Sequence, residues 1–77
     1  MDEKVVEFTW LVCLLDMYAE NDIWQDIIIN NTFNIEESID ELIYELRYRI
    51  DNLNKTDIKE IEFYSNALKI AEGLKEI

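Results

Sequence analysis

The sequence predicts an all-α fold, a compact bundle of three long helices and one short helix. The chain has 77 residues, no proline and a single glycine, so few positions force a helix to end. Its apolar residues recur mostly three and four positions apart, as in helices with a buried side. A chain of this length accommodates one domain. We expect the long helices at about residues 3–20, 35–53 and 57–75 and the short one at about 22–29, in a single helical domain of residues 1–77.

The first helix contains the most apolar stretch of the chain, from Val5 to Ala19. On a helix its apolar side chains cover about 260° of the circumference and leave a polar gap of about 80° that holds Thr9 and Asp16. A helix that is apolar on most sides needs neighbours on most sides. We therefore expect this helix in the middle of the bundle.

Three single residues of the apolar stretches have predicted environments. Cys13 is the only cysteine and is expected as a small buried hydrophobic residue in a reducing compartment. Trp10 and Trp24 are expected in the core or at its edge, with Trp24 the more exposed of the two.

The segment after Glu20 predicts the short helix. Asn21 is a good N-cap residue, and the apolar residues after it repeat at helical spacing. The β-branched run from Ile27 to Ile29 is also typical of a strand, but the chain has no second strand-like segment to pair with it. A helix is therefore the better interpretation.

The two remaining helices have clear start signals. Asn34 and Glu37 have the spacing of a capping box, which opens a helix at Ile35. The apolar residues of that helix fall within an arc of about 100°, the width of one buried stripe. Thr56 and Asp57 cap the last helix. Its apolar residues form two seams, so we expect it to touch two neighbours.

Acidic residues outnumber basic ones by 18 to 7, which gives a formal net charge of −11. Residues 1–46 hold 12 of the acids and one base, Lys4, whereas residues 47–77 hold six of each. A field of this sign repels nucleic-acid phosphates and anionic membranes and attracts basic surfaces. We expect a protein partner with a basic surface and no direct binding to nucleic acid or membranes.

The beginning of the chain predicts a cytoplasmic protein. Asp2 and Glu3 make it acidic where a secretory signal would be basic. The apolar stretch is interrupted by Glu7 and Asp16 and is shorter than the roughly 20 apolar residues of a transmembrane helix. The many Ile, Asn, Glu and Lys residues favour an AT-rich bacterial or phage genome as the source.

The face of the 35–53 helix opposite its apolar stripe is the main candidate site. Carboxylates stacked one turn apart along it destabilise an isolated helix, and solubility alone does not require them. Two tyrosines near its middle supply rigid contact area, and the carboxylates around them steer a basic surface. The predicted partner-binding residues are Glu37, Asp40, Glu41, Tyr44, Glu45, Tyr48 and Asp51.

Other interpretations of the same residues stay open. The acidic face can be a solvated surface that keeps the domain soluble. In a second interpretation, the surplus apolar area of the first and last helices is buried against a second copy, which makes the protein a structural homodimer with no inhibitory role.

A third interpretation is enzymatic. The spacing of Glu37 and Asp40, E-x-x-D, resembles one half of the metal motif of the MazG-like nucleotide pyrophosphohydrolases, an all-helical family. The resemblance implies Mg²⁺ and further acidic residues on an adjacent helix, for which Asp16 and Glu20 have suitable spacing.

Composition excludes several kinds of catalysis. Without histidine, Ser-His and Cys-His nucleophilic schemes are impossible, and one glycine cannot build a phosphate-binding loop. We predict no catalytic residue, cofactor or metal and no enzymatic activity. The sequence favours a small acidic protein-binding module that imitates nucleic acid and docks on a nucleic-acid-handling protein. Such a protein would be an inhibitor, of the antitoxin or immunity type or a phage-encoded protein directed against host or defence functions.

Overall fold

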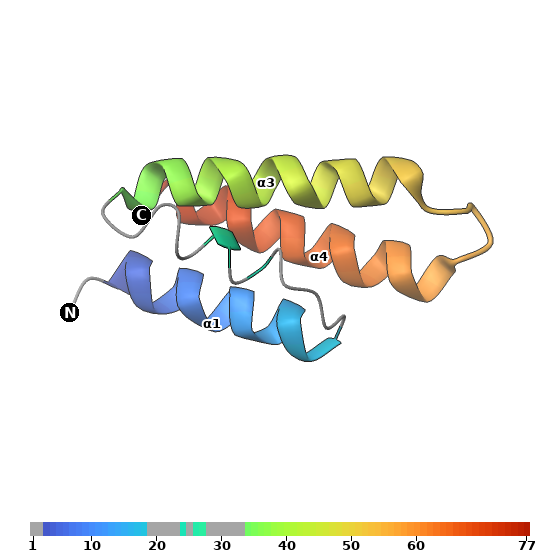
Figure 1. Cartoon of the computed structure of the whole chain (residues 1–77), viewed down its shortest axis with the longest axis horizontal. Coiled ribbons are helices and arrows are strands. Elements are labelled where there is room, and N and C mark those ends of the chain that lie inside the picture. The colour runs from blue at the N-terminus through green and yellow to red at the C-terminus, as the bar shows by residue number, and fades with distance from the viewer. Residues whose placement is uncertain (1–2, 19–23, 25, 28–33) are drawn as a thin grey trace.

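The computed structural model describes residues 3–18, 24, 26–27 and 34–77. These residues form three helices, namely α1 (Glu3–Tyr18), α3 (Ile35–Asn52) and α4 (Ile58–Leu74) (Figure 1). The predicted all-α fold is confirmed for this part of the chain, and the long helices agree with their predicted bounds to within two residues at each end. The described residues contain three helices instead of the predicted four, because the short helix expected at 22–29 falls mostly outside them.

The order of the helices in the bundle differs from the prediction. α4 lies between α3 and α1 and runs antiparallel to both (Figure 1). Its contacts with α3 are the most extensive, those with α1 come next, and α1 touches α3 least. The expectation that the first helix occupies the middle is wrong. α4 takes that place because it has apolar seams on two sides, and because Ala67 and Ala71 on its buried side allow close approach.

A single apolar core joins the three helices. Burying a large apolar side chain stabilises the fold by about 1.5–3 kcal/mol, so these contacts account for most of the cohesion of the bundle. The core residues of the described chain are Phe8, Leu11, Val12 and Leu15 of α1, Trp24, Ile27, Ile39, Leu42 and Leu46, and Tyr64, Ala67, Ala71 and Leu74 of α4.

Local sequence explains the start of α3. Asn34 is its N-cap residue, and its side-chain Oδ1 accepts a hydrogen bond of 3.2 Å from the backbone N–H of Glu37. The predicted cap at Asn34 is therefore confirmed. The hydroxyl of the buried Ser38 donates to the carbonyl oxygen of Asn34 at 3.0 Å. The bond from Glu37 satisfies one of the backbone N–H groups that a helix start otherwise leaves unpaired, and the bond from Ser38 gives a buried hydroxyl a partner.

Only one side of α1 is buried, which corrects the predictions for Trp10 and Cys13. Trp10 is 58% exposed and Trp24 is 0% exposed, the reverse of the expected order. Cys13 is exposed instead of buried. The reason is geometric: α3 and α4 both approach α1 from the side of Phe8 and Leu15, and apolar residues on the other side meet neither helix.

An ion-pair network joins three helix ends. Lys4 near the start of α1 is buried and pairs with Glu36 in the first turn of α3. Lys75 at the end of α4 pairs with Asp40 and lies 3.7 Å from the second carboxylate oxygen of Glu36. At the other end of α1, the ring of Tyr18 stacks on Phe63 of α4, with 3.8 Å between ring centroids. α1 is thus attached to the rest of the bundle at both ends.

None of the helices in the described parts of the chain combines the length and the apolar character that a membrane span requires.

Candidate protein-binding site

All seven residues predicted to bind a partner lie on α3, but the structure divides them into two groups. Five project from the side of α3 that is opposite the core, and all five are exposed. We call this group the α3 outer face; it consists of Glu37, Glu41, Tyr44, Tyr48 and Asp51. Asp40 and Glu45 lie at its edges and are engaged in ion pairs within the chain.

The two tyrosines dominate the α3 outer face. Tyr44 is 71% exposed and Tyr48 is 56% exposed. They lie one helical turn apart, so their rings occupy adjacent positions on the helix surface. Neither tyrosine ring is buried against a neighbouring helix. A large exposed aromatic pair is unusual on the surface of a small domain and is typical of a contact site.

The basic residues of α3 are turned away from the α3 outer face. Arg47 donates a hydrogen bond of 2.9 Å to Glu72 of α4. Arg49 donates one of 3.1 Å to Glu45, and its guanidinium lies 4.5 Å from the ring centre of the buried Trp24. Because the Arg49–Glu45 pair is largely buried and cation–π packed, it belongs to the core side of α3. Neither arginine of α3 therefore pairs with a carboxylate of the outer face.

The ion-pair network affects two titratable groups next to this face. A hydrogen bond from Lys4 holds the pKa of Glu36 below its usual value, with the charge of Lys75 adding to the effect. A hydrogen bond to Asp40 raises the pKa of Lys75. Both shifts favour the charged forms at neutral pH. Lys4 and Lys75 thus neutralise the carboxylates of Glu36 and Asp40 locally. The acidic surface of α3 begins beyond these two residues.

Comparison with known proteins gave no match: no family model, no curated protein and no solved structure is significantly similar to the chain.

Sequence reasoning missed a second exposed surface, which lies on α1. Val6, Trp10, Cys13 and Met17 are all exposed and share one side of the helix. Their spacing of four, three and four residues keeps them within an arc of about 60°. The spacing of these four residues could have indicated the surface from the sequence. It did not stand out because the opposite side of α1 is equally apolar. We call these four residues the α1 outer stripe.

The residues of the enzymatic interpretation can be placed only in part. The carboxylate of Asp40 is ion-paired with Lys75, Asp16 is half-buried on α1, and Glu20 lies outside the described residues. In the described part of the chain, no three acidic or cysteine side chains come close enough to hold a metal ion together.

Proposed function

We propose that the protein binds a basic surface of another protein through the α3 outer face. The observation that carries the proposal is the exposed pair Tyr44 and Tyr48, 71% and 56% exposed, on the acidic outer side of α3. The same helix keeps its arginines at its edges, in pairs with Glu45 and Glu72. Aromatic anchors with a surrounding rim of one charge are a common design of protein interfaces.

The two kinds of residue have different roles in the proposed interface. Tyrosines are frequent interface hot spots, and truncation of one typically costs more than about 1 kcal/mol of binding free energy. Exposed carboxylates contribute mainly to the rate of association and to the choice of partner, because they attract a positive surface from a distance. The tyrosines should therefore control dissociation, and the acids association.

We further propose that the partner is a nucleic-acid-handling protein and that binding inhibits it. Arginine and lysine side chains that bind phosphates also bind carboxylates, with similar charge-assisted hydrogen bonds. A row of carboxylates on a rigid helix can therefore occupy such a surface. A net charge of −11 on 77 residues strengthens the attraction to it. Inhibition then follows from occupancy of the surface that holds the nucleic acid.

The test uses affinity capture from a bacterial lysate, followed by direct binding measurements with the purified captured protein. The anchor variant is Tyr44→Ala with Tyr48→Ala, and the charge variant is Glu37→Lys with Glu41→Lys. A matched control, Glu62→Lys with Glu76→Lys, makes the same charge change at exposed positions in the α4 half of the chain.

We expect the anchor variant to raise the dissociation constant by about 30-fold or more, the sum of two hot spots. The charge variant should slow association and reduce its dependence on salt, while the control should change affinity by less than about threefold. Full binding by the anchor variant would remove the α3 outer face from the interface. If nucleic acid and this protein bind the captured partner simultaneously, the inhibitory role is wrong even though the interface stands.

A further inference from the structure

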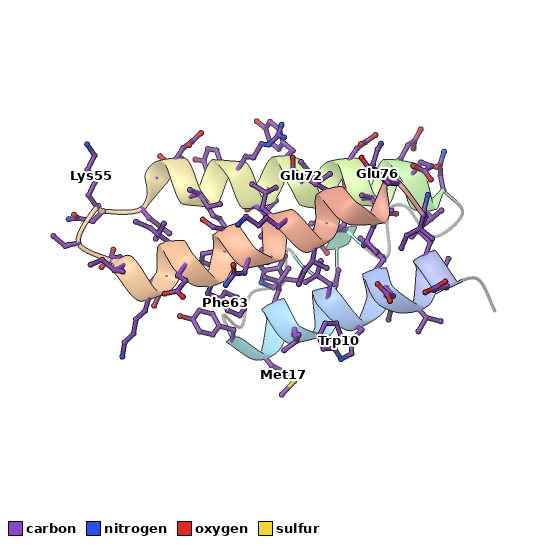
Figure 2. All side chains as sticks on the ribbon, turned by 180° about the vertical axis from the view of Figure 1, so that it is seen from behind. Trp10, Met17, Lys55, Phe63, Glu72 and Glu76 are labelled. Atoms are coloured by element: carbon purple, nitrogen blue, oxygen red, sulfur yellow. The ribbon has the colours of Figure 1, made fainter. Side chains whose placement is uncertain are left out.

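The α1 outer stripe has the geometry of a helix-pairing seam. Its four residues, Val6, Trp10, Cys13 and Met17, follow the alternating four- and three-residue spacing that two packed helices share. Trp10 and Met17 point away from both α3 and α4 (Figure 2), and they are 58% and 83% exposed. The stripe extends over three turns, so it can accept apolar side chains of a helix laid along it.

The chemistry beside the stripe is acidic on both sides. Glu3 and Glu7 are exposed on one flank, and Asp16 lies on the other. Lys4 is the only base of α1, and it is buried and paired with Glu36 on α3. The exposed side of α1 therefore carries no positive charge. The hydroxyl of Thr9, near the middle of the stripe, donates to the carbonyl oxygen of Val5 at 2.8 Å, so its donor is already used.

We propose that the α1 outer stripe binds a basic amphipathic helix of another protein, one with an apolar seam flanked by lysine or arginine. An apolar stripe with an acidic border is complementary to such a helix in both respects. This surface is separate from the α3 outer face, and the inference does not depend on the function proposed for that face.

A second copy of the chain is a poorer occupant. In an antiparallel pair of α1 helices packed along the stripe, the flank of Glu3 and Glu7 lies beside the same flank of the second copy, which brings like charges to one side of the seam. A parallel pair places the flank of Glu3 and Glu7 beside the flank of Asp16, which is also acidic. The stripe also offers only four apolar side chains, whereas a standard stable interface takes roughly 20–30 residues from each partner. A short basic helix that anchors through a few residues meets neither obstacle.

The experiment measures binding of three synthetic helical peptides of about four turns to the intact protein by titration calorimetry. The first has a leucine seam flanked by lysines, the second the same seam flanked by glutamates, and the third the composition of the first in an order that destroys the seam. The protein variants are Trp10→Ala with Met17→Ala, which removes the centre of the stripe, and Glu3→Lys with Glu7→Lys, which reverses one flank. Tyr44→Ala with Tyr48→Ala is the control.

We expect the lysine-flanked seam peptide to bind at least about tenfold more tightly than either other peptide. Removing the centre of the stripe should lower its affinity by a similar factor, and reversing the flank should shift the preference toward the glutamate-flanked peptide. The α3 control should bind as the wild type does, so that failure here is distinguishable from failure of the α3 outer face.

Three results would overturn the inference. Equal binding of the seamless lysine peptide shows that charge alone is responsible. Unchanged binding by the Trp10 and Met17 variant places the peptide elsewhere; circular dichroism establishes that this variant is folded, and if it is not, the flank reversal alone decides. Finally, a dimer of the wild type in sedimentation that the same variant dissociates would identify the second copy as the occupant.

Discussion

The clearest test of the structure compares two apolar residues of α1 that the sequence treats alike. Leu15 and Met17 lie two positions apart in the same apolar stretch. In the structure Leu15 is 0% exposed and belongs to the core, whereas Met17 is 83% exposed on the α1 outer stripe. We predict that Leu15→Ala strongly destabilises the protein and that Met17→Ala leaves its stability nearly unchanged.

The magnitudes follow from burial. Replacing a buried leucine by alanine removes about three carbon atoms from the core and leaves a cavity, at a total cost of about 2–5 kcal/mol. A chain of this length is expected to have an unfolding free energy of roughly 4–12 kcal/mol, so the loss is a large fraction of the whole. It should lower the melting temperature by roughly 10 °C or more. Met17→Ala removes little buried area, and alanine favours helix, so the change should stay within about 0.5 kcal/mol.

The assay is urea unfolding followed by circular dichroism, with thermal melts as a second measurement. Equal slopes of free energy against urea for the two variants and the wild type permit a direct comparison. A loss of more than about 2 kcal/mol in Met17→Ala would refute the exposed assignment. If that loss grew with protein concentration, the side of Met17 would be buried against another molecule. A Leu15→Ala variant as stable as the wild type would refute the assignment of Leu15 to the buried core.

Three further predictions concern other parts of the bundle. Gly73 lies in α4 and an added Cβ meets nothing within 4 Å, so Gly73→Ala should raise the unfolding free energy by up to about 1 kcal/mol, as measured in urea. Because the pKa of Glu36 is lowered by Lys4, its contribution is present above the ordinary value of 4.5 and lost as pH falls through the folded pKa. Glu36→Gln should therefore be less stable than the wild type at pH 7, and the difference should disappear as the pH falls below the folded pKa of Glu36; a difference that persists in acid would contradict this. Trp10→Phe, which leaves Trp24 as the only tryptophan, should emit at shorter wavelength and resist quenching by neutral acrylamide, whereas Trp24→Phe should be quenched readily, because Trp24 is buried and Trp10 is exposed.

The fold of α3 could be predicted from its sequence in detail. Asn34 and Glu37 specify its start, and its single apolar stripe, from Ile39 to Leu46, specifies the side that faces the core. The exposed tyrosines follow from the same pattern, because they lie opposite that stripe. The apolar stripe of an amphipathic helix indicates which side faces the core, so the orientation of α3 could be predicted without knowledge of its neighbours.

The orientation of α1 could not be predicted in this way. Its apolar residues lie on most sides of the helix, so the pattern alone does not indicate whether Phe8 or Trp10 faces the core. Contacts with α4 determine that Phe8 is buried and Trp10 is exposed. The assumption that the most apolar helix is the central one failed for the same reason. Centrality depends on having two sides that can approach other helices closely, and Ala67 and Ala71 provide this on α4.

The candidate site was predicted in part. Exposure of Tyr44 and Tyr48 follows from periodicity, but the fates of Asp40 and Glu45 depend on partners that periodicity does not reveal. Asp40 meets Lys75, which is 35 positions away in the chain. Glu45 lies one turn from Arg49, and their pairing is favoured on any helix; its burial results from the packing of Arg49 on Trp24.

Three helix ends meet at one end of the bundle, and the charged residues there complement the helix dipoles. α1 and α3 begin there with Glu3 and Glu36 in their first turns, and α4 ends there at Leu74, followed by the cap residue Lys75. At the far end, α3 closes with Arg49 and α4 opens with Glu60. Each of these charges opposes the partial charge of its own helix end and so stabilises it. Other carboxylates of α3, such as Glu41, lie along the side of the helix and away from these ends.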